Sequence, residues 1–233
     1  MCTVTYLPVD KKHFLLTQNR DEKFSRGIAL PPNKVSIGDT SIIYPTDTDA
    51  RGTWIALSEA FSCCLLNGGK EKHVSKPPYK QSRGNIILDF YKFNTVDDFL
   101  RAYNFDSIEP FTLVVVEHES RTVHEIILSN TEVQYQIKNG DLPHLWSSST
   151  LYDEATRNLR KYYFNLFTQT KAFTQDNILR FHQDGFKQDA EEGFIIHRDV
   201  GVKTVSVSSI LKQEQSTFMY IDLLNKKKQL LEL

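Results

Sequence analysis

The chain has 233 residues, of which 40% are hydrophobic and 24% charged, and its formal net charge is -1. This balance is typical of a folded globular protein and gives no overall attraction to nucleic acid or to an anionic membrane. Three cysteines, two of them adjacent, exclude a disulfide framework and favour a reducing, cytoplasmic compartment.

Alternating polar and apolar residues over 2–7 predict a strand, "PVDKK" predicts a turn, and "HFLLTQ" predicts the returning strand of a hairpin. "NRDEKFSRG" then breaks the pattern. A second hairpin is expected over residues 53–66, "TWIALSEAFSCCLL", and "NGG" ends it. The adjacent Cys63 and Cys64 fall inside this hairpin, where we expect them to pack in the core.

A polar loop leads to an apolar helical segment over residues 85–93 and to a second helix that begins at Thr95, with Asp98 completing the cap. Strands are expected over residues 111–118, 122–129 and 131–137, which is consistent with a meander, and helices over 150–167 and 176–184. The apolar side of the first of these two helices is expected to contain Leu151, Ala155, Leu159 and Tyr162 or Tyr163. The chain then ends in strands over residues 193–198, 203–209, 217–223 and 229–233.

The order of these elements separates antiparallel strands from pairs of helices, which indicates an α+β fold rather than a parallel sheet. Two stacked antiparallel sheets with helix layers outside them use every element, so we expect a four-layer α-β-β-α sandwich. No linker or internal repeat divides the chain, and we expect one domain over residues 1–233. No secretory signal is recognisable, and no stretch approaches the roughly 18 apolar residues of a membrane span.

Cys2 is the first candidate for chemistry. Removal of Met1 would leave its thiol beside its own α-amine, and these groups ordinarily titrate near ~8.5 and ~7.7–8.0. The amine can therefore accept the thiol proton, so that one residue supplies both nucleophile and base. The alternative is a cysteine at a strand edge without a role, because chain termini are commonly mobile.

The predicted hairpin brings Asn19, Arg20 and Asp21 to the end of the sheet where Cys2 begins. A carboxylate there could hold the α-amine, and a guanidinium could bind an acyl or carboxylate group of a substrate. Alternatively, Arg20 and Asp21 form a surface turn with a weak ion pair.

The stretches "MCT" and "QNRDEKFSR" resemble the opening of the NRDE family, which includes the transport and Golgi organisation protein 2 family. "GTWIAL" over residues 52–57 resembles a second signature of that family, and "SSSTLYDEA" over 147–155 is a weaker similarity. The NRDE family is similar in turn to the N-terminal nucleophile (Ntn) hydrolases, among them the cysteine acylases penicillin V acylase and bile salt hydrolase. This resemblance implies the four-layer sandwich.

The same resemblance implies a set of catalytic residues: Cys2 as nucleophile, Asp21 as the group that steers its amine, and Asn67 as an oxyanion donor. Asn67 could equally be a turn residue, since Asn-Gly is a strong hairpin signal. The chain departs from the acylases in carrying Gln18 where they carry Arg, and Ser148, within a run of three serines, where they carry a second Asn. Serine is a donor with a shorter reach.

A basic loop, defined here as residues 70–83, follows Asn67. At the rim of a Cys2 pocket, this loop could attract an acyl substrate that bears a phosphate or carboxylate, such as a coenzyme A thioester, and Lys70 is the candidate contact. The alternative is a solvated loop. Its basic residues are Lys70, Lys72, His73, Lys76, Lys80 and Arg83.

We therefore expect a cysteine Ntn hydrolase or acyltransferase that acts on an amide or a thioester through an acyl-enzyme at Cys2, with Asn19, Arg20, Ser148 and Lys70 as substrate-binding candidates. The histidines show no paired spacing typical of zinc, and we expect neither a metal nor an organic cofactor. The alternative is a non-catalytic binding or trafficking protein whose basic loop contacts an anionic ligand. The sequence does not indicate an oligomeric state.

Overall fold

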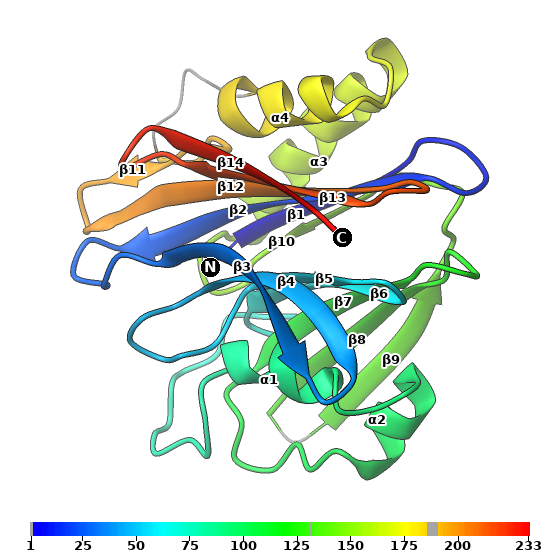
Figure 1. Cartoon of the computed structure of the whole chain (residues 1–233). Helices are drawn as coiled ribbons and strands as arrows, with labels where there is room; N and C mark the ends of the chain where they lie inside the picture. Colours follow the sequence, from blue (N-terminus) through cyan, green and yellow to red (C-terminus); the bar gives the residue numbers. More distant parts are fainter. Residues whose placement is uncertain (1, 131, 186–190) are drawn as a thin grey trace. The chain divides into compact units, whose positions relative to one another are not determined.

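The computed structural model describes residues 2–130, 132–185 and 191–233. The chain divides into two compact units, the first formed by residues 1–26 and 140–233 and the second by residues 27–139. Each unit contains one antiparallel sheet and a pair of helices (Figure 1). The α+β class and the two antiparallel sheets predicted from the sequence are confirmed, and the single domain over residues 1–233 stays a prediction.

The sheet of the first unit has the strand order β10-β1-β2-β12-β13-β14, with β11 also paired to β12. Its first hairpin is held by Asp10, whose Oδ1 accepts hydrogen bonds from the backbone N–H groups of Lys12 at 2.8 Å and His13 at 2.9 Å. A side chain that closes its own turn in this way fixes the register of the strands on either side. The strands are β1 (Cys2–Pro8), β2 (Phe14–Lys23), β10 (His144–Ser147), β11 (His197–Arg198), β12 (Val202–Lys212), β13 (Thr217–Asp222) and β14 (Lys227–Glu232).

Helices α3 (Glu154–Thr170) and α4 (Gln175–Asp184) lie on one face of this sheet (Figure 1). Both begin at a side-chain cap: Asp153 accepts from the N–H of Thr156, and Thr174 accepts from the N–H of Asn177. Between helices and sheet lies a core that contains Leu7, Leu15, Phe164, Phe167, Ile178, Phe181 and Phe194.

The apolar side predicted for α3 is wrong except at Tyr163, which packs against the core. Ala155 and Leu159 are exposed, and the buried residues of this helix are Thr156, Arg160, Phe164 and Phe167. Hydrophobic periodicity places an arginine on the solvent side, whereas Arg160 is fully buried because protein groups satisfy its guanidinium.

The second unit is a meander in which each strand pairs with the next, from β3 to β9. Helices α1 (Gly84–Phe90) and α2 (Val96–Ala102) pack on it through an aromatic core around Phe90 and Phe99. The Thr95 cap of α2 is confirmed, since its Oγ1 accepts from the N–H of Asp98 at 3.0 Å. The strands are β3 (Leu30–Ile37), β4 (Thr40–Thr46), β5 (Ile55–Ser58), β6 (Phe61–Asn67), β7 (Phe111–Glu117), β8 (Val123–Ser129) and β9 (Glu132–Lys138).

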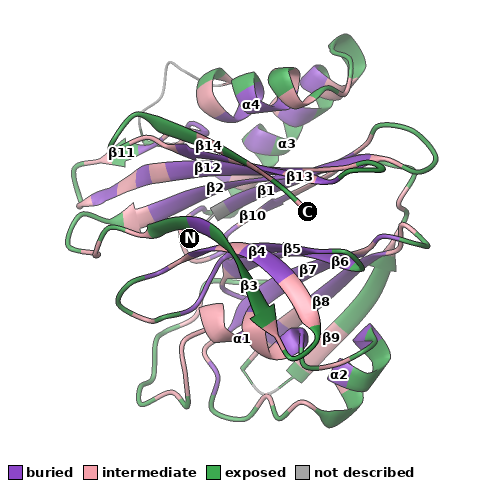
Figure 2. Cartoon of the chain, viewed as in Figure 1, coloured by how far each residue is buried: buried purple, intermediate pink, exposed green. Residues whose placement is uncertain are grey.

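Several strands differ from the sequence expectation. The NRDE residues belong to β2 instead of breaking it, and β3, β4 and β10 were not predicted. Strand β3 contains Pro31 and Pro32, which an edge strand tolerates because one side of it forms no ladder. The strand expected from Thr131 begins at Glu132, and Thr131 lies outside the described residues. Strands β3 and β9, the outer strands of their sheet, carry many exposed residues (Figure 2).

None of the helices within the described ranges is long and apolar enough to cross a lipid bilayer.

Replacing Phe181 with alanine tests the core of the first unit. The Phe181 ring lies 4.4 Å from that of Phe194 and 4.7 Å from that of Phe167, measured between centroids. We expect Phe181→Ala to lower the free energy of unfolding, measured by urea denaturation, by about 3–5 kcal/mol. Phe24→Ala, the same change at a half-exposed position, should cost less than about 1 kcal/mol. Equal costs would contradict this assignment of the core.

Candidate functional site

The register of the first hairpin places the NRDE motif beside the start of the chain. The backbone of Cys2 pairs with that of Arg20, and Thr3 pairs with Asn19. On the other side of β1, Thr3 pairs with Ser147, so Ser148 directly follows the last pair of β10. The expected proximity of Asn19, Arg20 and Asp21 to the start of β1 is confirmed, and Ser148 lies at the same end of the sheet.

Strand alternation divides the NRDE motif between the two faces of the sheet. Asn19 and Asp21 contact residues on the side of α3 and α4, whereas Arg20 shares the opposite face with its register partner Ser206. Arg20 is 4% exposed and lies 3.8 Å from the carboxylate of Glu22. These residues therefore form a buried polar part of β2 and not a surface turn.

The carboxylate of Asp21 is fully buried and is bound by two hydroxyl groups. Tyr152 Oη donates to Oδ2 at 2.9 Å, and Thr204 Oγ1 donates to Oδ1 at 2.7 Å. Burial raises the pKa of Asp21 above its ordinary value, and the hydrogen bond from Thr204 and the positive charge of Arg160 oppose this rise. Each carboxylate oxygen has a second lone pair, so the group can accept a further hydrogen bond.

Arg160 connects this carboxylate to β1. Its guanidinium lies 3.6 Å from the centroid of the Tyr152 ring, and it donates to the hydroxyl oxygen of Thr3, the residue next to Cys2. It also donates to the carbonyl oxygens of Glu192, at 3.0 Å, and Gly193. A buried guanidinium with this many acceptors is compensated, and it orients the ring that holds Asp21.

Asn19 on β2 and His182 on α4 form a second contact between the sheet and the helices. Its amide group donates to the carbonyl oxygens of His182 at 3.0 Å and Phe194 at 2.5 Å, which fixes its Oδ1 as an acceptor for His182 Nδ1 at 2.7 Å. The proton of the neutral imidazole is therefore on Nδ1, and Nε2 accepts from the Thr5 hydroxyl at 2.8 Å. Burial lowers the pKa of His182 to about 3. Asn19 thus binds protein groups, and its predicted contact with substrate stays a prediction.

Ser148 is 1% exposed, and its hydroxyl lies 2.9 Å from that of Thr150. Its carbonyl oxygen accepts from the backbone N–H of Tyr152 at 3.1 Å. Ser148 and Tyr152, which binds Asp21, therefore lie in one turn after β10.

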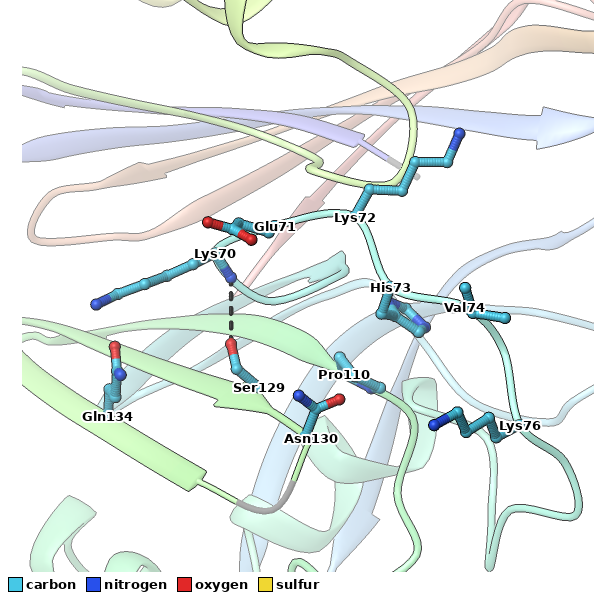
Figure 3. A pocket seen from close by; sticks show the side chains of 10 residues that line it. All are labelled: Lys70, Glu71, Lys72, His73, Val74, Lys76, Pro110, Ser129, Asn130 and Gln134. Carbon is cyan, nitrogen blue, oxygen red and sulfur yellow. Dashed lines mark hydrogen bonds between the residues drawn. The ribbon is translucent and has the colours of Figure 1, made fainter.

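Asn67 and Lys70 belong to the second unit. Asn67 ends β6, and Gly68 follows it with a positive φ of 93°, a conformation that favours glycine. Lys70 lines a pocket of about 400 Å³ together with other residues of the basic loop (Figure 3). The oxyanion role of Asn67 and the substrate contact of Lys70 stay predictions.

Sequence analysis missed Tyr152, Thr204, Arg160 and His182. The one signal was the "SSSTLYDEA" similarity, which contains Tyr152 without indicating its partner. Within the residues that the structure describes, no group of three or more His, Cys, Asp or Glu side chains could share a metal ion.

The buried imidazole predicts a dependence of stability on pH. The unfolded chain takes up a proton at His182 near its ordinary pKa of 6.5, and the folded chain does so only near about 3. The stability that the neutral group contributes is thus present above pH 6.5 and is lost as the pH falls toward 3, by an amount on the order of several kcal/mol. His182→Gln should flatten this fall in urea denaturation between these limits. His197→Gln, a change at an exposed histidine, should keep the wild-type slope, and a slope unchanged in His182→Gln would refute the assignment.

The Tyr152 hydroxyl predicts a second dependence on pH, of opposite sign. Tyr152→Phe removes a donor to Asp21 and should lower the free energy of unfolding at neutral pH by about 1–3 kcal/mol. Because this donor favours the charged carboxylate, its loss raises the pKa of Asp21 further. The loss of stability in Tyr152→Phe should therefore grow with rising pH. It should shrink below pH 3.8, the ordinary pKa of aspartate, because Asp21 is then protonated in the folded wild type and in the folded variant. Tyr162→Phe on the exposed side of α3 is the matched control, and a pH-independent cost would contradict the contact.

The comparisons with known proteins agree with this fold. A family model described as Transport and Golgi organisation 2 matches residues 1–220. The structure of penicillin V acylase from Agrobacterium tumefaciens is similar to this chain with a TM-score of 0.57 at 9% sequence identity, over 100% of this chain and 86% of the acylase chain. No individually curated protein matches the sequence.

At this identity the structural similarity shows the fold alone, and the predicted Ntn-hydrolase-like fold is confirmed. The match of the family model extends over most of the sequence. The chain therefore belongs to the Transport and Golgi organisation 2 family, as the NRDE and N-terminal motifs predicted.

Proposed function

We propose that the protein is an N-terminal nucleophile hydrolase or acyltransferase in which Cys2 attacks the carbonyl carbon of an amide or a thioester. The observation that carries this proposal is the register of the first hairpin, in which Cys2 pairs with Arg20 next to the buried carboxylate of Asp21. The Ntn-hydrolase-like fold, shared with a penicillin V acylase, supports the same class of reaction.

The first step needs the α-amine of Cys2. Met1, whose removal would free that amine, lies outside the described residues. The amine accepts the thiol proton, and the thiolate sulfur then forms a bond to the substrate carbonyl carbon. Among the described residues Asp21 accepts from two hydroxyl donors, each of its oxygens has a second lone pair, and we assign it the role of orienting the protonated amine.

Attack on the carbonyl gives a tetrahedral intermediate with a negative oxygen. A donor aimed at this oxygen commonly lowers the barrier by about 2.7–4 kcal/mol, and Asn67 is our candidate for it. As the intermediate collapses, the bond to the leaving group breaks and the ammonium returns its proton to the departing amine or thiolate. The products of this step are the free leaving group and an acyl-thioester on Cys2.

The second step releases the acyl group. A water molecule or an amine loses a proton to the α-amine and attacks the thioester, which regenerates the Cys2 thiol and yields an acid or a new amide. Arg20, Ser148 and Lys70 are our candidates for contacts with the substrate. Asn19 is the candidate whose polar atoms already bind the protein, and it would act by holding β1 and β2 in place.

A reducing, cytoplasmic location is part of this proposal, because the mechanism requires a free thiol. Among the described residues, the buried Cys63 and Cys64 form no disulfide, which suits such a compartment.

Selective labelling tests the nucleophile. Mature protein, shown by intact mass to lack Met1, is treated with iodoacetamide or p-nitrophenyl acetate at neutral pH, and the modified peptide is identified by mass spectrometry. We expect an adduct on Cys2 alone, since Cys63 and Cys64 are fully buried and burial raises the pKa of Cys63 to about 12.

Cys2→Ala should abolish the adduct, and Cys63→Ala, the matched control, should keep it. The hydrolase proposal fails if Cys2 in the mature protein is no more reactive than Cys63 and Cys64.

A second candidate function is non-catalytic binding or trafficking of an anionic ligand at the basic loop. The pocket of the second unit favours this candidate, because its lining contains four of the six basic residues of the loop. This candidate predicts that Cys2→Ala and Cys2→Ser leave the cellular phenotype intact, whereas the hydrolase proposal predicts its loss in Cys2→Ala.

A further inference from the structure

The pocket of the second unit lies between the first part of the basic loop and the residues around the end of β8 and the start of β9 (Figure 3). It combines three lysines and a histidine with polar side chains and a single acid. Its volume of about 400 Å³ is within the usual range for small-molecule sites. The lining residues are Lys70, Glu71, Lys72, His73, Val74, Lys76, Pro110, Ser129, Asn130 and Gln134.

The charge of this lining is positive even though the whole chain has a formal net charge of -1. Lys72 and Lys76 form no ion pair with any residue that the structure describes. The nearby carboxylate of Glu109 does not cancel this charge, because Arg83 Nη2 binds it at 2.9 Å and His73 Nε2 lies 3.2 Å from its other oxygen. An excess of lysine residues in the lining of a hollow favours a compact anion with several charges.

The loop that presents these lysines is anchored at both ends. At the first end, the backbone N–H of Lys70 donates to Ser129 Oγ at 3.3 Å, shown as the dashed line in Figure 3. A Cβ at Gly69 would meet this serine and the carbonyl oxygen of Leu128, at 2.7 Å from the latter, so only glycine permits so close an approach to β8. His73 contacts Glu109, and beyond Lys76 the backbone N–H of Lys80 donates to the carbonyl oxygen of Ser107 at 2.7 Å. A pre-positioned loop loses less conformational entropy when it binds a ligand.

Neutral groups complete the set of polar contacts. Asn130, at a positive φ of 58°, lies in the turn after β8, and the side chain of Lys76 extends toward it in Figure 3. Gln134 Nε2 donates to the carboxylate of Glu132 at 3.1 Å, which leaves its amide oxygen and second N–H for other partners. Val74 and Pro110 add apolar surface.

We propose that this pocket binds the phosphate group of a small phosphorylated molecule, with the ammonium groups of Lys70, Lys72 and Lys76 as the main contacts. Phosphate has several acceptor oxygens and a charge of about -1.5 to -2 when it is a monoester, which suits a cluster of lysines. A phosphate group alone fills only part of the hollow, so the rest of the volume and its apolar residues receive the organic part of the ligand. This inference deepens the second candidate function and does not depend on the reactivity of Cys2.

Titration calorimetry of the full chain with pyrophosphate and with glycerol 3-phosphate, at low ionic strength, tests the proposal. We expect saturable binding that replacement of Lys70, Lys72 and Lys76 together by glutamine weakens at least about tenfold. The matched control replaces Lys226, Lys227 and Lys228 by glutamine, a change of the same charge at the end of the β13–β14 connection and the start of β14. That variant should bind within about twofold of the wild type, apart from a general charge effect.

Absence of saturable binding, or an equal loss in both triple variants, would overturn the proposal, because binding would then reflect overall charge. Co-sedimentation with vesicles that contain phosphatidic acid distinguishes the source of the phosphate. Binding to vesicles without binding to glycerol 3-phosphate would overturn the small-molecule assignment in favour of a lipid headgroup.

The same titration on Cys2→Ala separates this proposal from the hydrolase. Retained phosphate binding in a protein whose Cys2 proves unreactive would remove the hydrolase proposal and support the pocket. Loss of binding in Cys2→Ala would overturn the pocket assignment as an independent site.

Discussion

The buried carboxylate of Asp21 is the constraint on which the first unit depends. An ionised carboxylate removed from water costs several kcal/mol unless donors and opposite charge replace its hydration. Here the hydroxyls of Tyr152 and Thr204 supply the donors. The guanidinium of Arg160, which stacks on the Tyr152 ring, supplies a positive charge. These groups come from β12, from α3 and from the turn that precedes α3. Compensation of one charge therefore joins β2, residues 152–160 and β12, three segments that are distant in the sequence.

The same network sets how β1 is held. Arg160 binds Thr3 and His182 binds Thr5, so two polar side chains from the helices hold alternate residues of the strand that begins with Cys2. Arg20 lies on the opposite face of the sheet, where it is buried and near Glu22. Positioning of β1 through Thr3 and Thr5 suits a reactive residue near a chain end, where an unsupported backbone would fray. The fold in this way offers a physical reason why a nucleophile could work at the second position of a chain.

The pocket of the second unit rests on a different principle. In the first unit the buried charge of Asp21 is compensated by neighbouring groups. In the loop that follows Gly69, Lys72 and Lys76 form no ion pair among the described residues, while Arg83 and His73 contact Glu109. Anchoring a loop of like charges costs electrostatic free energy that a bound anion would recover. A family member with this arrangement could bind a phosphorylated ligand whether or not Cys2 is reactive, and the two proposals are separable for that reason.

Local patterns in the sequence determined the α+β class, the first hairpin, the Thr95 cap and the β7–β9 meander. They also identified Cys2 and Asp21 as candidates. These features could be predicted because strand alternation, capping and turn chemistry act within a few residues. Only the tertiary structure decided which groups surround the site. Tyr152 and Thr204 stand 131 and 183 residues from Asp21, and no periodic pattern relates positions so far apart. The burial of Arg160 was likewise decided by its acceptors, since hydropathy assigns an arginine to solvent until the groups that satisfy it are known.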